Sequence, residues 1–256
     1  MLDVIIRHAG LAYGMHTLFS NLDLTLKGGQ WTCLLGGSGV GKTSLLRFIA
    51  GLHSGKGIHR EGSVTCQDGQ PLKGRIAWMA QQDTLLPWLS VLNNITLGDK
   101  LRAPFFRQKK SAPEVKERAL DILQKVGLEK KADVLPHCLS GGQRQRVALA
   151  RTLMENRPVV LMDEPFGSLD AVTRLNLQDL ACELLANKTV LLITHDPLEA
   201  LRLGHQVYHL RGHPATLTDA IEPEGPPPRS LEDSRLLLLQ GRLLDRLRHE
   251  ELEGSP

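Results

Sequence analysis

Hydrophobic and polar residues alternate along two stretches near the N-terminus, Leu2 to Ile6 and Leu22 to Leu26. This alternation predicts strands that bury one face. Gly28 and Gly29 indicate a turn after the second stretch. A continuous apolar run from Trp31 to Leu35 comes next and predicts a strand that is buried on both faces.

Predicted helices and strands alternate along much of the remaining chain. Residues Thr43 to Ala50 have helical spacing, and Gly51 suits the left-handed residue that ends a helix. Buried strands are predicted for Arg75 to Met79, Val159 to Met162 and Thr189 to Thr194, and helix-like segments precede the last two. Strands separated by helices favour an α/β fold with a largely parallel sheet covered on both faces.

The strand pattern disappears between Leu85 and Glu155. Helical spacing in Glu114 to Val126 and in Gln143 to Met154 predicts a helical subdomain, about residues 85–157, inserted into the sheet domain. We expect the whole sheet domain to occupy residues 1–212.

The composition changes after Gly212. Glu222 to Pro228 is rich in proline and is typical of a linker, whereas Ser230 to Glu253 is a leucine-rich helix candidate. We therefore expect residues 213–256 to form a linker and a C-terminal helical extension that packs on the domain or on a partner.

Composition narrows the class of protein only slightly. The 256 residues are 41% hydrophobic and carry a net charge of +3, which suits a globular core and gives no argument for a polyanion partner. Aromatic residues are few, so a surface that stacks nucleic-acid bases is not expected. The cysteines are scattered, which is typical of reduced thiols and gives no zinc or redox motif: Cys33, Cys66, Cys138 and Cys182.

The N-terminal residues lack the pattern of a secretion signal. No apolar run approaches the roughly 20 residues that cross a bilayer. We therefore expect any work at a membrane to depend on other chains that span it.

The segment from Gly36 to Thr43 fits the phosphate-loop pattern GxxxxGK[ST], between a predicted strand and a predicted helix. Glycines let successive backbone N–H groups turn toward a phosphate, and the helix N-terminus adds partial positive charge. Lys42 is expected to reach the β- and γ-phosphates of a nucleotide, and the Thr43 hydroxyl to bind Mg²⁺. A plain glycine-rich turn would not explain the lysine and threonine.

Two carboxylates, Asp163 and Glu164, follow the apolar run that ends at Met162. They are costly there unless a cation lies nearby, and in a phosphate-loop protein the carboxyl ends of the strands converge on the nucleotide. Asp163 is expected to hold Mg²⁺, and Glu164 to polarise the attacking water. His195 ends another predicted strand at the same edge, where it would contact the γ-phosphate. The alternative for the two carboxylates is a solvated strand end, and the alternative for His195 is an ordinary surface or core histidine.

The sequence Leu139-Ser-Gly-Gly-Gln143 precedes a helical run. Ser140 and Gln143 fit a capping box, which leaves Gly141 and Gly142 unexplained. Consecutive glycines suggest close backbone approach, and a helix N-terminus with bare amides and a hydroxyl is a second phosphate site. Two phosphate sites with one nucleotide loop suggest a dimer that shares ATP across its interface.

At these residues the chain resembles the ATP-binding cassette (ABC) ATPases, over roughly residues 1 to 212. GGSGVGKT resembles the Walker A loop of that family, LSGGQ its signature and VVLMDEP its Walker B segment. The segment from Ser168 to Asp170 resembles the D-loop. Gln81 matches the Q-loop glutamine, His195 the switch histidine and Tyr13 the aromatic residue that stacks on adenine.

The resemblance implies a P-loop NTPase fold, an ABC ATPase core with an N-terminal antiparallel β-subdomain and an inserted helical signature subdomain. It implies ATP and Mg²⁺ as cofactors, and two subunits packed head to tail, so that each ATP lies between one chain's Walker motifs and the other's signature. Catalysis is assigned to Glu164, His195 and Gln81, and metal binding to Thr43, Gln81 and Asp163. The residues assigned to nucleotide binding are Tyr13, Gly36, Gly37, Ser38, Gly39, Val40, Gly41, Lys42, Thr43, Ser44, Ser140, Gly141, Gly142, Gln143 and Asp170.

The chain departs from the family pattern at two points. Gly37 stands where many members have proline, which removes no phosphate ligand. Gln82 follows Gln81 directly, so the Q-loop glutamine is ambiguous by one residue. Gln81 is preferred because it lies four residues before Leu85, as in the family.

The segment from Leu85 to Trp88 is similar to a subgroup of bacterial importer ATPases for taurine, aliphatic sulfonates, nitrate or thiamine-pyrimidine precursors. In the family this segment borders the groove that receives a coupling helix of the membrane subunit, and the alternative is a turn with a buried tryptophan. The resemblance implies a peripheral subunit at the cytoplasmic face of the cell membrane. Its partners would be a second ATPase subunit, a permease and, indirectly, a solute-binding protein, with no nucleic acid.

Two other classes share some of these motifs. Soluble ABC ATPases that act on DNA or ribosomes usually have two cassettes or a long coiled-coil insertion, and the basic stretch from Arg107 to Lys110 is more typical of a solvated face than of a nucleic-acid contact. A nucleotide kinase would share the phosphate loop but has no use for LSGGQ.

Overall fold

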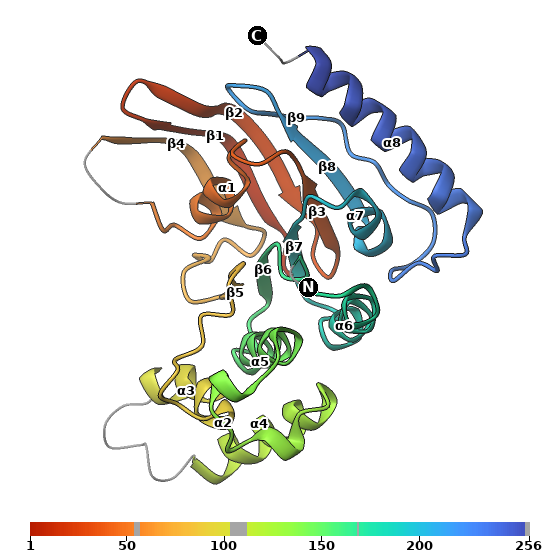
Figure 1. The fold of residues 1–256 in the computed structure, drawn as a ribbon. Coiled ribbons are helices and arrows are strands. Elements are labelled where there is room, and N and C mark those ends of the chain that lie inside the picture. Colours follow the sequence, from red (N-terminus) through yellow and green to blue (C-terminus); the bar gives the residue numbers. More distant parts are fainter. Residues whose placement is uncertain (54–56, 103–111, 168, 254–256) are drawn as a thin grey trace.

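The computed structural model describes residues 1–53, 57–102, 112–167 and 169–253 and contains two sheets (Figure 1). The smaller sheet is antiparallel, with the order β2-β1-β4, formed by β1 (Val4–Tyr13), β2 (His16–Leu26) and β4 (Ile58–Cys66). This confirms the expected N-terminal antiparallel subdomain, although β1 and β2 extend well beyond the alternating stretches. The strand β4 was not anticipated, because its side chains are mostly exposed and polar.

The larger sheet has the strand order β5-β6-β7-β3-β8-β9. The first five strands are parallel and only β9 is antiparallel, so the largely parallel sheet expected from the sequence is confirmed. The strands are β3 (Trp31–Leu35), β5 (Ile76–Met79), β6 (Val159–Asp163), β7 (Thr189–Ile193), β8 (Gln206–Arg211) and β9 (Thr216–Leu217).

Alternate side chains of the central strands enter two separate hydrophobic cores. On β6, Val159 and Leu161 pack with helix α1 (Lys42–Ile49) and the antiparallel sheet. Val160 and Met162 point to the other face, which is covered by helices α5 (Gly141–Met154), α6 (Ala171–Leu184), α7 (Pro197–Leu203) and α8 (Ser234–Glu253). Every residue of β6 is buried, as a continuous apolar run predicts for a central parallel strand.

A third core lies within the helical segment at one end of the molecule (Figure 1). It joins α5 to α2 (Val91–Ile95) and α4 (Ala112–Lys125), and the short helix α3 (Leu97–Arg102) follows α2. Leu85 belongs to this core, whereas the Trp88 side chain is 71% exposed. The turn with a buried tryptophan is therefore wrong. The basic stretch at residues 107–110 lies outside the described residues.

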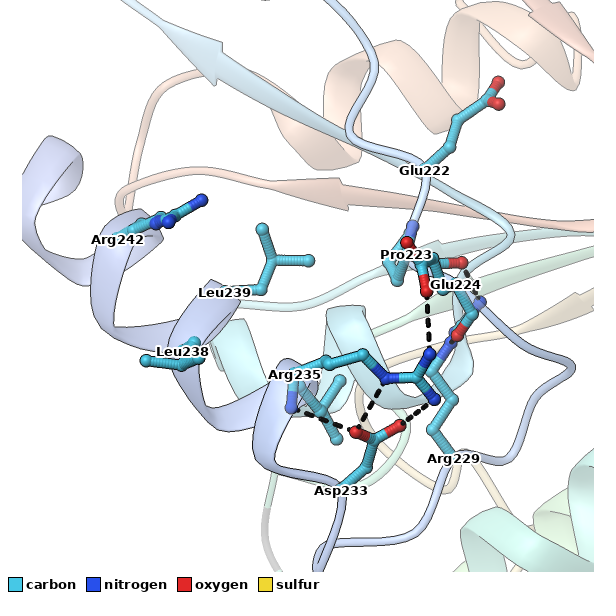
Figure 2. A pocket seen from close by; sticks show the side chains of 10 residues that line it. Glu222, Pro223, Glu224, Arg229, Asp233, Arg235, Leu238, Leu239 and Arg242 are labelled. Atoms are coloured by element: carbon cyan, nitrogen blue, oxygen red, sulfur yellow. Dashed lines mark hydrogen bonds and ion pairs between the residues drawn. The ribbon is translucent and has the colours of Figure 1, made fainter.

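The C-terminal extension packs on the larger-sheet core of the same chain. Leu236 and Leu243 of α8 are buried, and α8 contacts α7. The chain leading to it is fixed by Arg229, whose buried guanidinium donates to the carbonyl oxygens of Leu201 and Gly204 at 2.8 Å, near the C-terminal end of α7. A hollow of about 290 Å³ lies beside this junction, and Figure 2 shows the side chains that line it.

No helix in the described part of the chain is long and apolar enough to span a membrane. The cysteines are free thiols, three of them buried, as expected from their scatter.

Candidate functional site

The phosphate loop connects β3 to α1 at the carboxyl edge of the parallel sheet. Gly41, the residue before the helix, has φ of 109°, which a side chain would strain. A Cβ at Gly36 would lie 2.7 Å from the Leu210 carbonyl oxygen, so this glycine lets the loop pass close to β8. A Cβ at Gly37 would meet nothing within 4 Å, so packing gives no reason for a glycine at this position.

The buried side chain of Lys42 crosses the inside of the phosphate loop and contacts its first residues. Its Nζ donates to the carbonyl oxygens of Gly36 and Gly37, both at 2.8 Å, and lies 3.9 Å from Glu164 Oε1. Burial lowers the pKa of the lysine, while the nearby carboxylates of Glu164 and Asp163 oppose that shift. The cation is thus positioned where the loop's backbone groups converge, which suits a phosphate ligand.

Thr43 and Asp163 meet at the expected metal position. The Thr43 hydroxyl donates to Asp163 Oδ2 at 2.9 Å, and burial raises the pKa of the aspartate although the threonine hydrogen bond opposes this. The described residues contain no group of three or more His, Cys, Asp or Glu that could hold a metal. Two hard oxygen donors at a phosphate loop nevertheless fit Mg²⁺, since this ion keeps waters and substrate phosphates as its remaining ligands.

Glu164 brings two other predicted residues together. Its Oε2 accepts a hydrogen bond from Gln81 Nε2 at 3.3 Å and lies 3.2 Å from His195 Nδ1. Glu164 itself has φ of 46°, a strained value for a residue other than glycine. Its N–H still donates to the Ile193 carbonyl oxygen, so the turn is fixed at the end of β6.

The contact also bears on the choice of Q-loop glutamine. Gln81, rather than Gln82, is the residue that bonds Glu164. The His195 side chain is 60% exposed, which leaves it accessible to a ligand at the same edge.

The signature residues begin α5, in the helical segment and apart from the phosphate loop of the same chain (Figure 1). Ser140 and Gln143 form both hydrogen bonds of the capping box. A Cβ at Gly142 would come within 3.1 Å of the Thr173 side chain, so this glycine has a packing role. Gly141 has only the Arg144 guanidinium near that position, at 3.9 Å, so packing gives no reason for it.

Asp170 caps α6 by accepting a hydrogen bond from the Thr173 N–H at 3.0 Å, which lowers the pKa of the aspartate. Asp170 is exposed, so its carboxylate is accessible to a nucleotide or to a second subunit. Ser168, the first residue of the D-loop segment, lies outside the described residues.

The remaining predicted nucleotide contacts lie around the loop. Val40 is buried, Ser38 is exposed and Gly39 has φ of 81°. Tyr13 ends β1 and is 39% exposed, and its hydroxyl lies 3.2 Å from His53 Nδ1. His53 in turn reaches the carbonyl oxygen of Ser44 in α1. No spacing or motif pointed to His53.

The fold and this arrangement of loop, carboxylates and histidine define a P-loop nucleotide-binding protein. The family model described as ABC transporter matches residues 19–167, and the chain belongs to this family. It is an ATPase of the ABC type.

Named relatives and a solved structure agree with this assignment. The chain is 45% identical over 251 residues to an uncharacterized ABC transporter ATP-binding protein of Haemophilus influenzae, covering 97% of this chain and 100% of that protein. It is 41% identical over 240 residues to the aliphatic sulfonates import ATP-binding protein SsuB 1 of Rhodococcus jostii, covering 93% and 90%. The fold resembles the dimeric, post-hydrolysis structure of the ATP-binding cassette MJ0796 bound to ADP and Pi, with a TM-score of 0.73 and 30% identity, covering 87% of this chain and 99% of that one.

Proposed function

We propose that this chain is the ATP-hydrolysing subunit of an importer for aliphatic sulfonates or similar small organic anions. The observation that carries the proposal is the near-full-length similarity, 41% and 37% identity, to sulfonate import ATP-binding proteins of Rhodococcus jostii and Pseudomonas syringae. Residues 1–212 would form the ATPase domain, with the helical subdomain at about 85–157, and residues 213–256 the linker and helical extension. These relatives favour import over a non-transport role.

The arrangement of the site residues supports hydrolysis of the γ-phosphate by an attacking water molecule. Lys42 and the loop amides bind the β- and γ-phosphates, and Thr43, Asp163 and Gln81 would hold Mg²⁺. When bound, this ion neutralises charge on the phosphate oxygens. Glu164 accepts a hydrogen bond from the attacking water and polarises it, while Gln81 and His195 orient the Glu164 carboxylate and that water.

A second ATPase subunit completes the site. The signature at Ser140 to Gln143 lies apart from the phosphate loop of its own chain, yet it presents a helix N-terminus with exposed polar groups. In a head-to-tail dimer this N-terminus would meet the γ-phosphate held by the partner. The solved relative is itself described as dimeric.

The segment from Gln81 to Trp88 is the proposed link to a permease. Leu85 anchors it in the helical core, whereas the Trp88 indole is exposed and available to a partner. ATP would close the dimer and carry docked permease helices with it, by rigid-body motion. The chain would then lie at the cytoplasmic face of the membrane, with a solute-binding protein delivering the solute on the other side.

A transport experiment tests this function. The chain is co-expressed with the permease and the solute-binding protein of a sulfonate importer, and uptake of a radiolabelled alkanesulfonate is measured with wild type, Trp88→Ala and Leu101→Ala, an exposed control in α3. We expect Trp88→Ala to reduce co-purification with the permease and uptake, while the isolated subunit keeps its ATPase activity. Uptake of other solutes but not sulfonates would refute the substrate, and unchanged assembly in Trp88→Ala would refute the docking segment.

A further inference from the structure

His53 joins the proposed adenine-stacking residue to the helix of the phosphate loop. The Tyr13 hydroxyl lies 3.2 Å from His53 Nδ1, and His53 Nε2 lies 2.8 Å from the backbone oxygen of Ser44. The two rings also touch edge to face, with centroids 6.1 Å apart and planes at 67°. Ser44 and His53 lie close in sequence, in α1 and the turn after it, and tertiary packing brings Tyr13 at the end of β1 to them.

The hydrogen-bond partners fix the direction of this chain of contacts. A carbonyl oxygen can only accept, so His53 Nε2 carries a proton and donates it to Ser44. In the neutral ring the other nitrogen, Nδ1, is then an acceptor, and the Tyr13 hydroxyl donates to it. The tyrosine is thus held by a directional bond to an imidazole that is itself fixed to α1.

We propose that His53 is a positioning residue for nucleotide binding, which holds the Tyr13 ring ready to stack on the adenine of ATP. Tyr13 is the last residue of its strand and is partly exposed, so without a second attachment its ring samples several rotamers. Ordering such a side chain on binding has an entropic cost that weakens affinity. The hydrogen bond to His53 orders the Tyr13 ring before ATP binds, so this entropic cost is not incurred on binding. Through His53, the adenine site is also connected to α1, the helix that follows the phosphate loop.

This inference rests on the proposed stacking role of Tyr13 and predicts a base-dependent effect. ATP has an adenine and inorganic tripolyphosphate does not, although both can bind the phosphate loop. Loss of His53 should therefore weaken binding of ATP and spare binding of tripolyphosphate. A general defect in α1 would weaken both ligands equally.

The test measures affinities of the full chain for Mg²⁺-ATP and Mg²⁺-tripolyphosphate by calorimetry, with KM and kcat for ATP. In His53→Ala we expect ATP affinity to fall about 3- to 10-fold, the effect of one lost hydrogen bond, with tripolyphosphate affinity unchanged and the loss appearing in KM. His53→Gln retains a donor and an acceptor and should restore most of the affinity. His59→Ala, an exposed histidine on β4, is the matched control.

Variants of Tyr13 distinguish the positioning role of His53 from the adenine-stacking role of Tyr13 on which it rests. Tyr13→Phe should match His53→Ala, and the double variant should lose no more than either one, because both remove the same bond. If Tyr13→Ala binds ATP as wild type does, the stacking role itself fails. If Tyr13→Ala weakens ATP but His53→Ala does not, or if His53→Ala weakens tripolyphosphate equally, the positioning role of His53 is overturned.

Discussion

Arg144 Nε lies 2.9 Å from Asp83 Oδ2, which joins the first turn of the signature helix to the loop that follows Gln81. Arg151, two turns further along α5, reinforces this junction by donating to the Asp83 carbonyl oxygen at 2.8 Å and to the Thr84 hydroxyl at 2.7 Å. The loop that carries the Glu164 contact is therefore fixed to the helix that would face the partner's ATP. A shift of α5 on dimer closure should be transmitted to Gln81.

The first prediction tests this junction. Arg144→Met should lower ATP turnover about 2- to 5-fold while ATP binding to the isolated subunit is kept, because the loop can no longer hold Gln81 on Glu164. A double-mutant cycle with Asp83→Asn should give a coupling of about 0.5–1 kcal/mol in turnover. The control is Arg118→Met, which breaks a comparable ion pair with Asp99 in the same helical segment. Additive effects of Arg144→Met and Asp83→Asn on turnover would show that this contact does not transmit movement of α5 to Gln81.

The second prediction concerns the catalytic carboxylate. Glu164→Gln should keep ATP affinity but lower turnover at least about 100-fold, because an amide cannot accept a proton from water. ATP should then trap a closed dimer, which size-exclusion chromatography detects. Glu183→Gln changes an exposed carboxylate on α6 and should behave as wild type. Turnover near wild type in Glu164→Gln would remove Glu164 from the mechanism.

The central strands and the phosphate loop could be predicted because short stretches of sequence determine them. The all-buried runs of β3, β6 and β7 cannot alternate, and the loop glycines follow directly from backbone geometry. β4 was missed because its side chains face solvent. The helix α8 begins at Ser234 rather than Ser230, since the four residues before it lead from the Arg229 junction.

Contacts between distant residues could not be predicted in this way. The motifs placed Glu164 and His195 at one sheet edge, but not the hydrogen bond from Gln81 or the strained φ of Glu164. His53 and Asp83 belong to no spacing pattern, because their partners lie 40 and 61 residues away. Such residues become visible only when the packing of the sheet and helices is known.

The third prediction separates nucleotide binding from assembly. Lys42→Ala should lose ATP affinity, since it removes the cation facing the phosphates. Ser140→Arg should leave ATP binding to the monomer intact but prevent the ATP-dependent dimer, by placing bulk and charge at the proposed γ-phosphate contact. Ser140→Ala controls for loss of the helix cap, which costs about 1 kcal/mol. Equal loss of nucleotide binding in Lys42→Ala and Ser140→Arg, measured by calorimetry, would mean that the signature does not act across a dimer.

The fourth prediction concerns the attachment of the C-terminal extension. Arg229 is buried, and its guanidinium satisfies carbonyl oxygens of α7 and of the linker, which Arg229→Ala would leave without donors. We expect the free energy of unfolding to fall by about 2–4 kcal/mol, measured with urea. Arg235→Ala is the control, because the Arg235 side chain is 67% exposed and its ion pairs with Asp233 and Glu224 therefore contribute little (Figure 2). A similar loss of unfolding free energy in both variants would show that the buried hydrogen bonds of Arg229 do not attach the C-terminal extension more strongly than an exposed ion pair does.

The last prediction is a pH dependence that originates at Glu199, on α7. Burial raises the pKa of this carboxyl to about 8; the Thr194 hydroxyl donates to Glu199 Oε2 and opposes the rise, whereas the nearby Asp196 carboxylate adds to it. Because the folded pKa lies above the unfolded one, the protonated folded state is favoured at low pH. This contribution to stability is lost as pH rises toward 8.

Glu199→Gln cannot ionise, so the stability of the variant should rise relative to wild type between pH 5 and pH 8. The difference in unfolding free energy should change by up to about 1.4 kcal/mol per pH unit in that window. Urea unfolding at pH 5.5, 7 and 8.5 measures it, with Glu183→Gln as an exposed control that should show no such trend. A wild-type-to-variant difference that is constant with pH would show that Glu199 ionises normally in the folded protein.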